Sequence, residues 1–294
     1  MSAGAAGLTL GTIPYHLLAK DDFVTISILH RNDIHSHIEP FSDSNSRYDG
    51  KGGIARIAAL AKNQRLKNPD TLLFDAGDMF QGTPYFNYFK GELILKVMSA
   101  AGYDAGTIGN HEFDNGLQGL LEPLPNAEFP LISSNYDFSD TILAGKFPRW
   151  KIFNRSGIKI GVYGLGIELE GLVDRKRFGS TQYLDPLKTA REMEKFLKIE
   201  KDCDLVVCLS HLGLKCEDKK FSDLLIAPET SYTDLIIGGH THTFLEKPVS
   251  VRNKQGKEII VNQAWWGGLM VGKVDFVFER AGKKQKSAFA EKLN

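Results

Sequence analysis

The sequence predicts an α/β fold in which two packed sheets are flanked by helices. In the first half, short apolar runs alternate with helical patterns, which implies a sheet of parallel neighbouring strands joined by right-handed crossovers. In the second half, strand patterns follow one another with few helices between them, which indicates a second sheet. Because no linker rich in Pro, Gly or Ser divides the chain, we expect one domain over residues 22–280.

Strands and helices are expected to alternate in the first half. Short apolar runs predict strands at Val24–His30, Thr71–Phe74, Ala105–Ile108 and Pro130–Ser134. Apolar residues at helical spacing predict helices at Gly53–Lys67, Phe86–Ala101 and Asn115–Leu121.

The second half is expected to begin with a hairpin and to end in a meander. A hairpin-like turn at Asn154–Gly157 separates strand patterns at Phe147–Phe153 and Lys159–Leu165. A helix is predicted over Pro186–Ile199. Further strands, the last three of which read as the meander, are predicted at Leu205–Leu209, Leu235–Ile237, Val249–Arg252, Glu258–Asn262 and Met270–Phe278.

Both ends of the chain are expected to lie outside the domain. Within residues 1–21, the stretch Ser2–Ala19 is mildly apolar and uncharged, like the apolar region and cleavage zone of an export signal, although no basic segment precedes it. The alternative is a disordered native tail. Because its Gly and Ala content resembles that of twin-arginine signals, we expect an exported, periplasmic protein. Residues 281–294 are basic and polar, which predicts a frayed C-terminal tail.

The composition argues against several classes of protein. Lys and Arg number 36, as do Asp and Glu, so the formal net charge is zero and no nucleic-acid track or polybasic membrane patch is indicated. No apolar run reaches the ~18 residues that a membrane-spanning helix needs. The three cysteines are odd in number and loosely spaced, so they do not predict a disulfide framework.

Five short segments follow predicted strands and carry side chains that bind metals. They are Arg31–His35, Asp75–Asp78, Gly109–Gly116, Ser210–His211 and Gly238–His242. In an open α/β sheet, loops that leave the carboxyl ends of strands converge on one crevice. Each segment alone could be an ordinary turn or a satisfied core histidine. Their shared place after strands favours one polar, metal-binding site.

These segments supply enough donors for two divalent cations. Metals of borderline hardness take imidazole nitrogen and carboxylate oxygen together. Asp78 is the expected bridge, because a carboxylate can span two cations whereas an imidazole binds one. Gly77 and Gly109 would let the backbone approach closely. The candidate ligands are Asp33, His35, Asp78, Asn110, His211, His240 and His242.

The order of these motifs resembles that of the metallophosphatase (calcineurin-like phosphoesterase) superfamily. Its pattern is Asp-x-His, Gly-Asp, Gly-Asn-His, a single His and Gly-His-x-His. Within the superfamily, Leu29–His37, Gly52–Arg56 and Gly109–Gly116 resemble the catalytic domain of 5′-nucleotidases and UDP-sugar hydrolases. The resemblance covers about residues 24–280. It implies a four-layer α/β/β/α sandwich of two mixed sheets flanked by helices.

The resemblance also implies a role for each candidate residue. One metal would be held by Asp33, His35, Asp78 and His242. The other would be held by Asp78, Asn110, His211 and His240. The two divalent ions would be Zn, Mn, Fe or similar. His111 and Asp114 match the catalytic His-Asp pair of the family. Arg31 stands where the family usually has Thr, and we expect it to alter contacts at the rim of the site.

We expect a dinuclear-metal phosphoester hydrolase, a 5′-nucleotidase-like phosphomonoesterase that acts through a metal-bound hydroxide in line with the leaving group. The substrate would be a small phosphoester, such as a nucleotide. His111 would neutralise or protonate the leaving oxygen, and Asp114 would orient its ring. Alternatives are a cyclic-nucleotide phosphodiesterase or a sulfur-ester hydrolase, which would use the same ligands. A third alternative is a non-catalytic partner subunit, which would have no reason to keep every ligand.

Base recognition is the weakest part of this interpretation. The 5′-nucleotidases of the family carry a second domain whose aromatic side chains stack on the base. The sequence ends at Asn294, so we expect that domain to be absent here and a separate chain to supply it. Trp265-Trp266-Gly267 either packs in the core or forms a pocket wall beside the metals.

Overall fold

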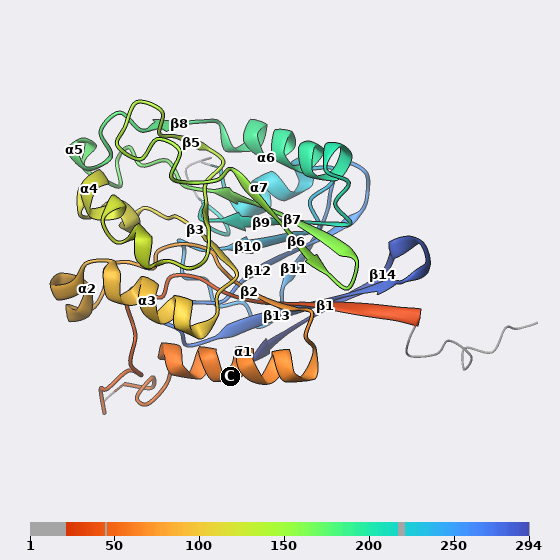
Figure 1. Ribbon diagram of the computed structural model, residues 1–294, viewed down its shortest axis with the longest axis horizontal. Helices are drawn as coiled ribbons and strands as arrows, with labels where there is room; N and C mark the ends of the chain where they lie inside the picture. Colours follow the sequence, from red (N-terminus) through yellow and green to blue (C-terminus); the bar gives the residue numbers. More distant parts are fainter. Residues whose placement is uncertain (1–21, 45, 217–220, 294) are drawn as a thin grey trace, which may run out of the picture.

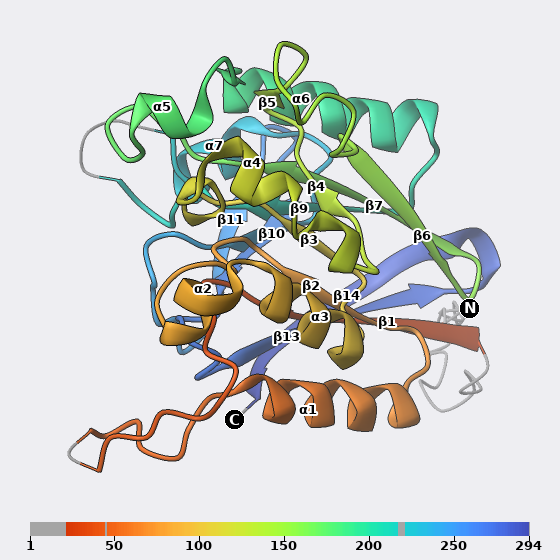
Figure 2. The same cartoon turned by 60° about the vertical axis from the view of Figure 1, so that its left-hand side comes forward.

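Two six-stranded sheets form the centre of this computed structural model, which describes residues 22–44, 46–216 and 221–293. Helices cover the outer face of each sheet, with α1 and α3 on one side and α6 on the other (Figure 1). Figure 2 shows the same layers from the side of α2 and α5. The expected four-layer α/β/β/α sandwich is therefore confirmed. The predicted export signal in residues 1–21 lies outside the described residues.

The first sheet has the strand order β14-β13-β1-β2-β3-β4. Its strands are β1 (Phe23–Arg31), β2 (Thr71–Asp75), β3 (Ala105–Thr107), β4 (Leu131–Ile132), β13 (Val271–Glu279) and β14 (Lys284–Leu293). The strands β1 to β4 are parallel neighbours, as the alternation of strand and helix patterns predicts. The strand β13 runs antiparallel to β1, so the sheet is mixed.

The second sheet has the order β11-β12-β10-β9-β7-β6. Its strands are β6 (Trp150–Arg155), β7 (Ile158–Leu165), β9 (Leu205–Ser210), β10 (Leu235–Gly238), β11 (Val249–Arg252) and β12 (Glu258–Gln263). Its four central strands are parallel, and β6 and β11 close the edges in antiparallel pairing. A separate two-stranded sheet joins β5 (Tyr136–Asp137) and β8 (Gln182–Tyr183).

The α-helices are α1 (Ile54–Lys67), α2 (Pro84–Phe89), α3 (Glu92–Ala101), α4 (Gly116–Leu121), α5 (Arg175–Phe178), α6 (Pro186–Lys195) and α7 (Asp223–Ile226). Short 3₁₀ turns are η3 (His111–Phe113), η4 (Leu124–Asn126), η6 (Ala227–Glu229) and η7 (Ala281–Lys283), and a π-helical turn, η5 (Phe196–Glu200), extends α6. The predicted helix Pro186–Ile199 thus corresponds to α6 and its extension.

Three apolar clusters occupy the three interfaces between the four layers. Successive residues of a strand point to opposite faces, so each central strand contributes to two clusters. In β1, Ile28 faces the other sheet and Leu29 faces the helical layer of α1 and α3. In β9, Val207 faces the first sheet and Val206 faces α6. This double burial explains why both strands read as continuous apolar runs.

The predicted helix Phe86–Ala101 is wrong as a single element, because the chain breaks between α2 and α3. Lys90 has a positive φ of 53° and ends α2. A Cβ atom on Gly91 would lie 2.0 Å from Cζ of Phe80, so only glycine fits this close approach. Helical periodicity continues through the break and conceals it in the sequence.

The C-terminal part of the chain also differs from expectation. The strand predicted at Met270–Phe278 does not continue the meander of the second sheet. It crosses to the first sheet as β13 and pairs with β1. Residues 284–293, expected to be frayed, form β14 on the free edge of β13, where Ala288 packs against the cluster between the sheets. Alternation predicts a strand, but the choice of partner strand depends on long-range packing.

The hairpin of β6 and β7 is confirmed. Ser156 and Gly157 occupy its two turn positions with φ of 44° and 84°. Positive φ at both central positions is the geometry of a type I′ turn, which matches the right-handed twist of the flanking strands.

Candidate metal centre

The seven candidate ligands lie on five loops, each of which follows the carboxyl end of a strand. Three of these loops follow β1, β2 and β3 in the first sheet, and two follow β9 and β10 in the second. Both sheets therefore contribute to one site. The crevice expected from a single open sheet is instead formed where the ends of two packed sheets meet.

The first group of donors, which we call the open cluster, consists of Asp33, His35 and His242. One donor atom from each lies within 4.8 Å of the others. Nε2 of His35 lies 2.9 Å from Nε2 of His242, and the latter lies 3.3 Å from Oδ1 of Asp33. Nδ1 of His35 lies 3.2 Å from the carbonyl oxygen of Phe80, to which it can donate, so Nε2 is left free for a cation.

The second group, the buried cluster, consists of Asp78, His211 and His240, whose donor atoms also lie within 4.8 Å of one another. Nε2 of His211 lies 3.0 Å from Oδ2 of Asp78. Asn110 joins this cluster, because its Oδ1 lies 3.0 Å from Nδ1 of His240. The seven candidate residues thus lie together in two neighbouring groups.

The carboxylate of Asp78 attracts positive charge within the buried cluster. Burial disfavours a charged His211, but the carboxylate of Asp78 more than offsets this and raises the pKa of His211 to about 10. Burial and the neighbouring charge on His211 together lower the pKa of His240 to about 4, so this ring is neutral. Nδ1 of His211 donates to the carbonyl of Ala76 at 2.7 Å, which aims Nε2 at Asp78. A divalent cation would take the place of the proton on Nε2 of His211, since metals bind neutral, oriented imidazoles beside carboxylates.

His111 and Asp114 form the predicted pair. Nδ1 of His111 lies 2.8 Å from Oδ2 of Asp114, and the backbone N–H of His111 donates to Oδ1 of Asp78 at 2.9 Å. Burial opposes a charge on His111, but the hydrogen bond to Asp114 and the charge of Asp78 raise its pKa to about 9. His111 also lies within 4.8 Å of donor atoms of His35 and Asp78, so it stands between the two clusters.

Backbone conformation at the site is unusual. Five of the seven candidate ligands have φ between 46° and 70°, a region that non-glycine residues rarely adopt: Asp33, His35, Asp78, His240 and His242. Such conformations persist only where the surrounding structure imposes them, and they concentrate at functional sites. The close approach predicted at Gly109 is confirmed, since a Cβ atom there would lie 2.3 Å from Oδ1 of Asp78.

Glu112 is a site residue that the sequence reasoning missed. Its fully buried carboxylate accepts backbone N–H groups from the loops after β2 and β3, belonging to Asp78, Met79, Phe80 and Gly109. Burial raises the pKa of Glu112 to about 7, and the charge of Asp78 contributes to the rise. Glu112 thereby ties two ligand loops together. Its signal in the sequence is its place directly after Gly109-Asn-His111.

Arg31 does not lie at the rim, so the expectation of altered rim contacts is wrong. Its side chain is fully buried and pairs with Asp75, with Nη2 at 3.0 Å from Oδ2. Its Nε donates to the hydroxyl of Tyr103. The cause is strand geometry, since Arg31 is the last residue of β1 and points into the layer of α3, where Met98 also contacts it.

The two tryptophans have different surroundings. The ring of Trp266 stacks on His242, with centroids 5.8 Å apart and planes 9° apart, so it stands beside the open cluster. The ring of Trp265 packs instead against Tyr48 and Phe244. Of the two tryptophans, Trp266 is therefore the one that lies beside the candidate metal centre.

Comparison with known proteins identifies the relatives of this chain. The calcineurin-like phosphoesterase family matches residues 26–244. A snake venom 5′-nucleotidase from Gloydius brevicauda is 32% identical over 285 residues, which cover 90% of this chain and 47% of that protein. The chain thus spans about half the length of the curated relatives it matches.

Solved structures agree with this result. The 5′-nucleotidase precursor from Thermus thermophilus superposes with a TM-score of 0.81 at 32% identity, covering 92% of this chain and 54% of that one. The calcineurin-like phosphoesterase YfkN from Bacillus subtilis superposes with a TM-score of 0.75 at 26% identity, covering 92% and 90% of the two chains.

Proposed function

Because the chain belongs to the calcineurin-like phosphoesterase family, we propose that it hydrolyses phosphate monoesters of nucleotides with the help of two divalent cations. The observation that carries the proposal is that seven metal-type donors from both sheets lie together, with the pair His111 and Asp114 beside them. The relatives named 5′-nucleotidase support the choice of a nucleotide.

The donor sets of the two clusters fit two cations that share one carboxylate. We assign Asp33, His35, Asp78 and His242 to one ion. We assign Asp78, Asn110, His211 and His240 to the other. Such ions, when bound, withdraw charge from the phosphoryl oxygens and make water a better nucleophile. Zn, Mn and Fe all accept a mixed set of nitrogen and oxygen donors.

His111 is proposed to act as the acid towards the leaving oxygen. An ionised carboxylate only accepts hydrogen bonds, so Asp114 fixes the proton of His111 on Nδ1. The hydrogen bond to Asp114 favours the imidazolium form of the ring by raising its pKa, and Nε2 of that form carries the proton that an alkoxide leaving group needs. Arg177 in turn holds Asp114, donating to its carbonyl oxygen at 2.6 Å.

No cysteine is needed as a nucleophile. Cys208, three residues before His211, is fully buried in β9, and burial raises the pKa of its thiol far above the usual value. A buried neutral thiol is inert towards phosphate esters. Within the described part of the chain, none of the three cysteines, Cys203, Cys208 and Cys216, forms a disulfide.

Metal analysis together with a substrate panel tests the proposal. We expect two equivalents of divalent metal in the purified protein. We expect release of phosphate from AMP and from nitrophenyl phosphate, and little turnover of cyclic AMP, bis-nitrophenyl phosphate or a sulfate ester. Faster cleavage of the cyclic nucleotide or the sulfur ester would favour those alternatives. Inactivity towards the whole panel at full metal content would favour a non-catalytic partner subunit.

The same panel measures base selectivity. A stacked base is worth ~1–3 kcal/mol, roughly ten- to a hundredfold in binding or more. We expect the 294-residue chain to hydrolyse nitrophenyl phosphate within about tenfold of AMP in kcat/KM. A preference for AMP far beyond a hundredfold would reveal a base pocket in this chain. The separate chain that would supply a substrate-binding domain stays a prediction.

Export to the periplasm is also part of the proposal. It is supported by the composition of Ser2–Ala19 and by relatives that include a venom protein. No helix within the described ranges is long and apolar enough to cross a membrane. Deleting residues 2–19 should leave the melting temperature unchanged, as expected for a cleaved signal. A large fall in melting temperature would show that the segment belongs to the folded structure.

A further inference from the structure

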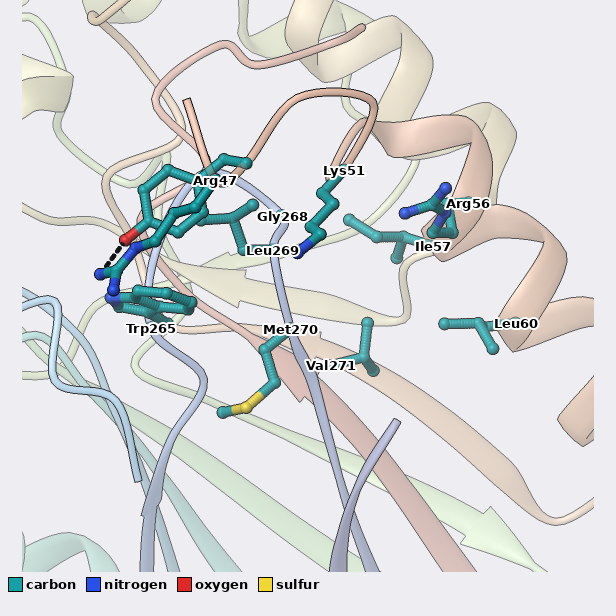
Figure 3. Close-up of a pocket in the computed structure, with 11 residues that line it drawn as sticks. Arg47, Lys51, Arg56, Ile57, Leu60, Trp265, Gly268, Leu269, Met270 and Val271 are labelled. Atoms are coloured by element: carbon teal, nitrogen blue, oxygen red, sulfur yellow. Dashed lines mark hydrogen bonds between the residues drawn. The ribbon is translucent and has the colours of Figure 1, made fainter. Parts of the chain in front are cut away.

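A cavity of about 440 Å³ lies between helix α1, the loop that precedes it and the turn that leads into β13 (Figure 3). It shares no lining residue with the seven candidate ligands or with the pair His111 and Asp114. The lining residues are Arg47, Tyr48, Lys51, Arg56, Ile57, Leu60, Trp265, Gly268, Leu269, Met270 and Val271.

The charge of this cavity is one-sided. Its lining includes Arg47, Lys51 and Arg56 but no acidic residue, although acidic and basic residues are equal in number over the whole sequence. Among the described residues, none of the three cations forms an ion pair with a carboxylate. Arg56 donates to the carbonyl oxygen of Gly50 at 3.3 Å, and the three side chains are exposed. These cations are available to an anion from solution.

The rest of the lining is apolar or aromatic. The apolar wall of the cavity is formed by three buried residues, Ile57, Met270 and Val271. The rings of Tyr48 and Trp265 meet edge to face with centroids 5.2 Å apart. The guanidinium of Arg47 lies over both rings, 4.8 Å from the centroid of Tyr48 and 5.9 Å from that of Trp265. Flat π-surfaces are therefore placed directly beside positive charge.

We propose that this cavity binds a nucleoside monophosphate at a second site, apart from the metal centre. The phosphate is held by Lys51 and Arg56, since guanidinium and ammonium groups are the usual partners of phosphate oxygens. The base packs against Trp265 and the apolar wall, where stacking is tolerant of base identity. A ligand with only a negative charge would contact the basic residues alone, and a ligand with only a ring would contact the aromatic and apolar residues alone.

The experiment measures binding stoichiometry in the metal-loaded full-length protein. The probe is the AMP analogue in which methylene replaces the ester oxygen, which prevents hydrolysis. We expect two equivalents to bind to the wild-type protein. K51A/R56A should bind one equivalent and keep hydrolysing nitrophenyl phosphate. Asp78→Asn, which alters the metal centre, should also retain one equivalent. Because this second equivalent does not need metals, failure of the cavity and failure of the proposed hydrolysis give different results.

Two control variants distinguish specific binding in the cavity from non-specific attraction of the anion to positive charge. Lys67→Ala removes an exposed cation from the last turn of the same helix α1 and should still bind two equivalents. Lys51→Glu, a single change of an exposed side chain, covers the case in which the double variant is poorly folded. It should weaken the second equivalent by about tenfold or more.

Partial ligands test the two halves of the cavity. Adenosine lacks the phosphate and ribose 5-phosphate lacks the base, so each should bind at this site at least about tenfold more weakly than the AMP analogue. Trp265→Leu should weaken the AMP analogue and leave ribose 5-phosphate unchanged. A single equivalent in the wild-type protein that K51A/R56A still binds, or two equivalents in both K51A/R56A and Lys51→Glu, would overturn the proposal. A single equivalent that K51A/R56A loses would support the cavity and contradict nucleotide binding at the metal centre.

Discussion

The two donor clusters share one crevice but differ in burial. Each cluster has two buried donors and one more accessible histidine. That histidine is the half-buried His240 in the buried cluster, whereas in the open cluster it is His242, whose side chain is 38% exposed. Both have two imidazoles and a carboxylate, so the difference is not one of donor chemistry. The two clusters differ instead in how rigidly the surrounding protein fixes the donor side chains.

The support behind each cluster explains this difference. His211 is fixed by the carbonyl of Ala76, and the loop of Asp78 is fixed by Glu112. His242 instead rests on the face of Trp266, and within the described part of the chain no hydrogen bond ties its second ring nitrogen to the protein. A ligand oriented by hydrogen bonds loses little freedom when it binds a metal. We therefore expect the buried cluster to bind its cation more tightly than the open cluster.

The largest effect is expected at Asp78, the residue assigned to both ions. Asp78→Asn should lose both cations on dialysis and lower turnover by more than about 10⁴, because each ion supplies several kcal/mol of transition-state stabilisation. Asp33→Asn, the matched carboxylate of the open cluster, should lose one. Elemental analysis with steady-state kinetics measures both effects. Equal metal content in the two variants would contradict the bridging assignment.

The next effect concerns His111, which stands between the clusters. His111→Ala should keep both cations and lower turnover by about 10²–10⁴, the usual contribution of an acid-base group. The loss should be smaller for nitrophenyl phosphate than for AMP, since a good leaving group needs no proton. Loss of one metal equivalent from this variant would show instead that His111 is a ligand, as its proximity to His35 and Asp78 allows.

The sequence predicts those features of the fold that depend on residues close together in the chain, and it fails for those that depend on distant residues. Local patterns were sufficient for the parallel strands β1 to β4 and for the hairpin turn at Ser156-Gly157. They were insufficient for β13, because strand alternation does not specify whether its partner is β12 or β1. They also failed at Lys90, where the helix breaks beside Gly91, a residue that lies too close to the ring of Phe80 to carry a side chain.

The same distinction between local patterns and long-range contacts applies to the candidate site. Ligand identities and their order in the sequence were enough to predict which residues meet, because strand ends converge by topology. The groups that position them were not predictable in this way. Glu112 and Arg31 are both charged residues near motifs, and nothing local distinguishes the one that binds ligand loops from the one that pairs with Asp75 behind β1.

A smaller effect compares one histidine from each cluster. His242→Ala should release one cation to a chelator about 10- to 100-fold faster than the wild-type protein does, while the second ion stays bound. His211→Ala should lose the other ion and also lower the melting temperature, because it leaves a cavity in a fully buried place. The measurement follows metal release with a chromogenic chelator. Identical release profiles would remove the distinction between the clusters.

The smallest effect concerns Asp223, a buried residue that contacts the strand end carrying His211. Oδ1 of Asp223 accepts the hydroxyl of Ser210, the residue before His211, at 2.5 Å. Burial raises the pKa of Asp223 from 3.8 to about 7 in the folded protein. The folded state therefore binds this proton more tightly than the unfolded state. The contribution of the protonated Asp223 to the free energy of unfolding is largest below pH 4 and is lost as the pH rises to 7.

Asp223→Asn keeps an oxygen acceptor for Ser210 but cannot ionise. Its free energy of unfolding should therefore fall less than that of the wild-type protein between pH 4 and pH 8, by on the order of 2 kcal/mol. Urea unfolding at several pH values, with both proteins at the same metal content, measures the difference in slope. The slope is the informative quantity, because the new amide N–H groups in this buried place can shift stability equally at every pH. Parallel pH profiles would mean that Asp223 is ionised at neutral pH, and the charge behind His211 would then strengthen the attraction of the buried cluster for its cation.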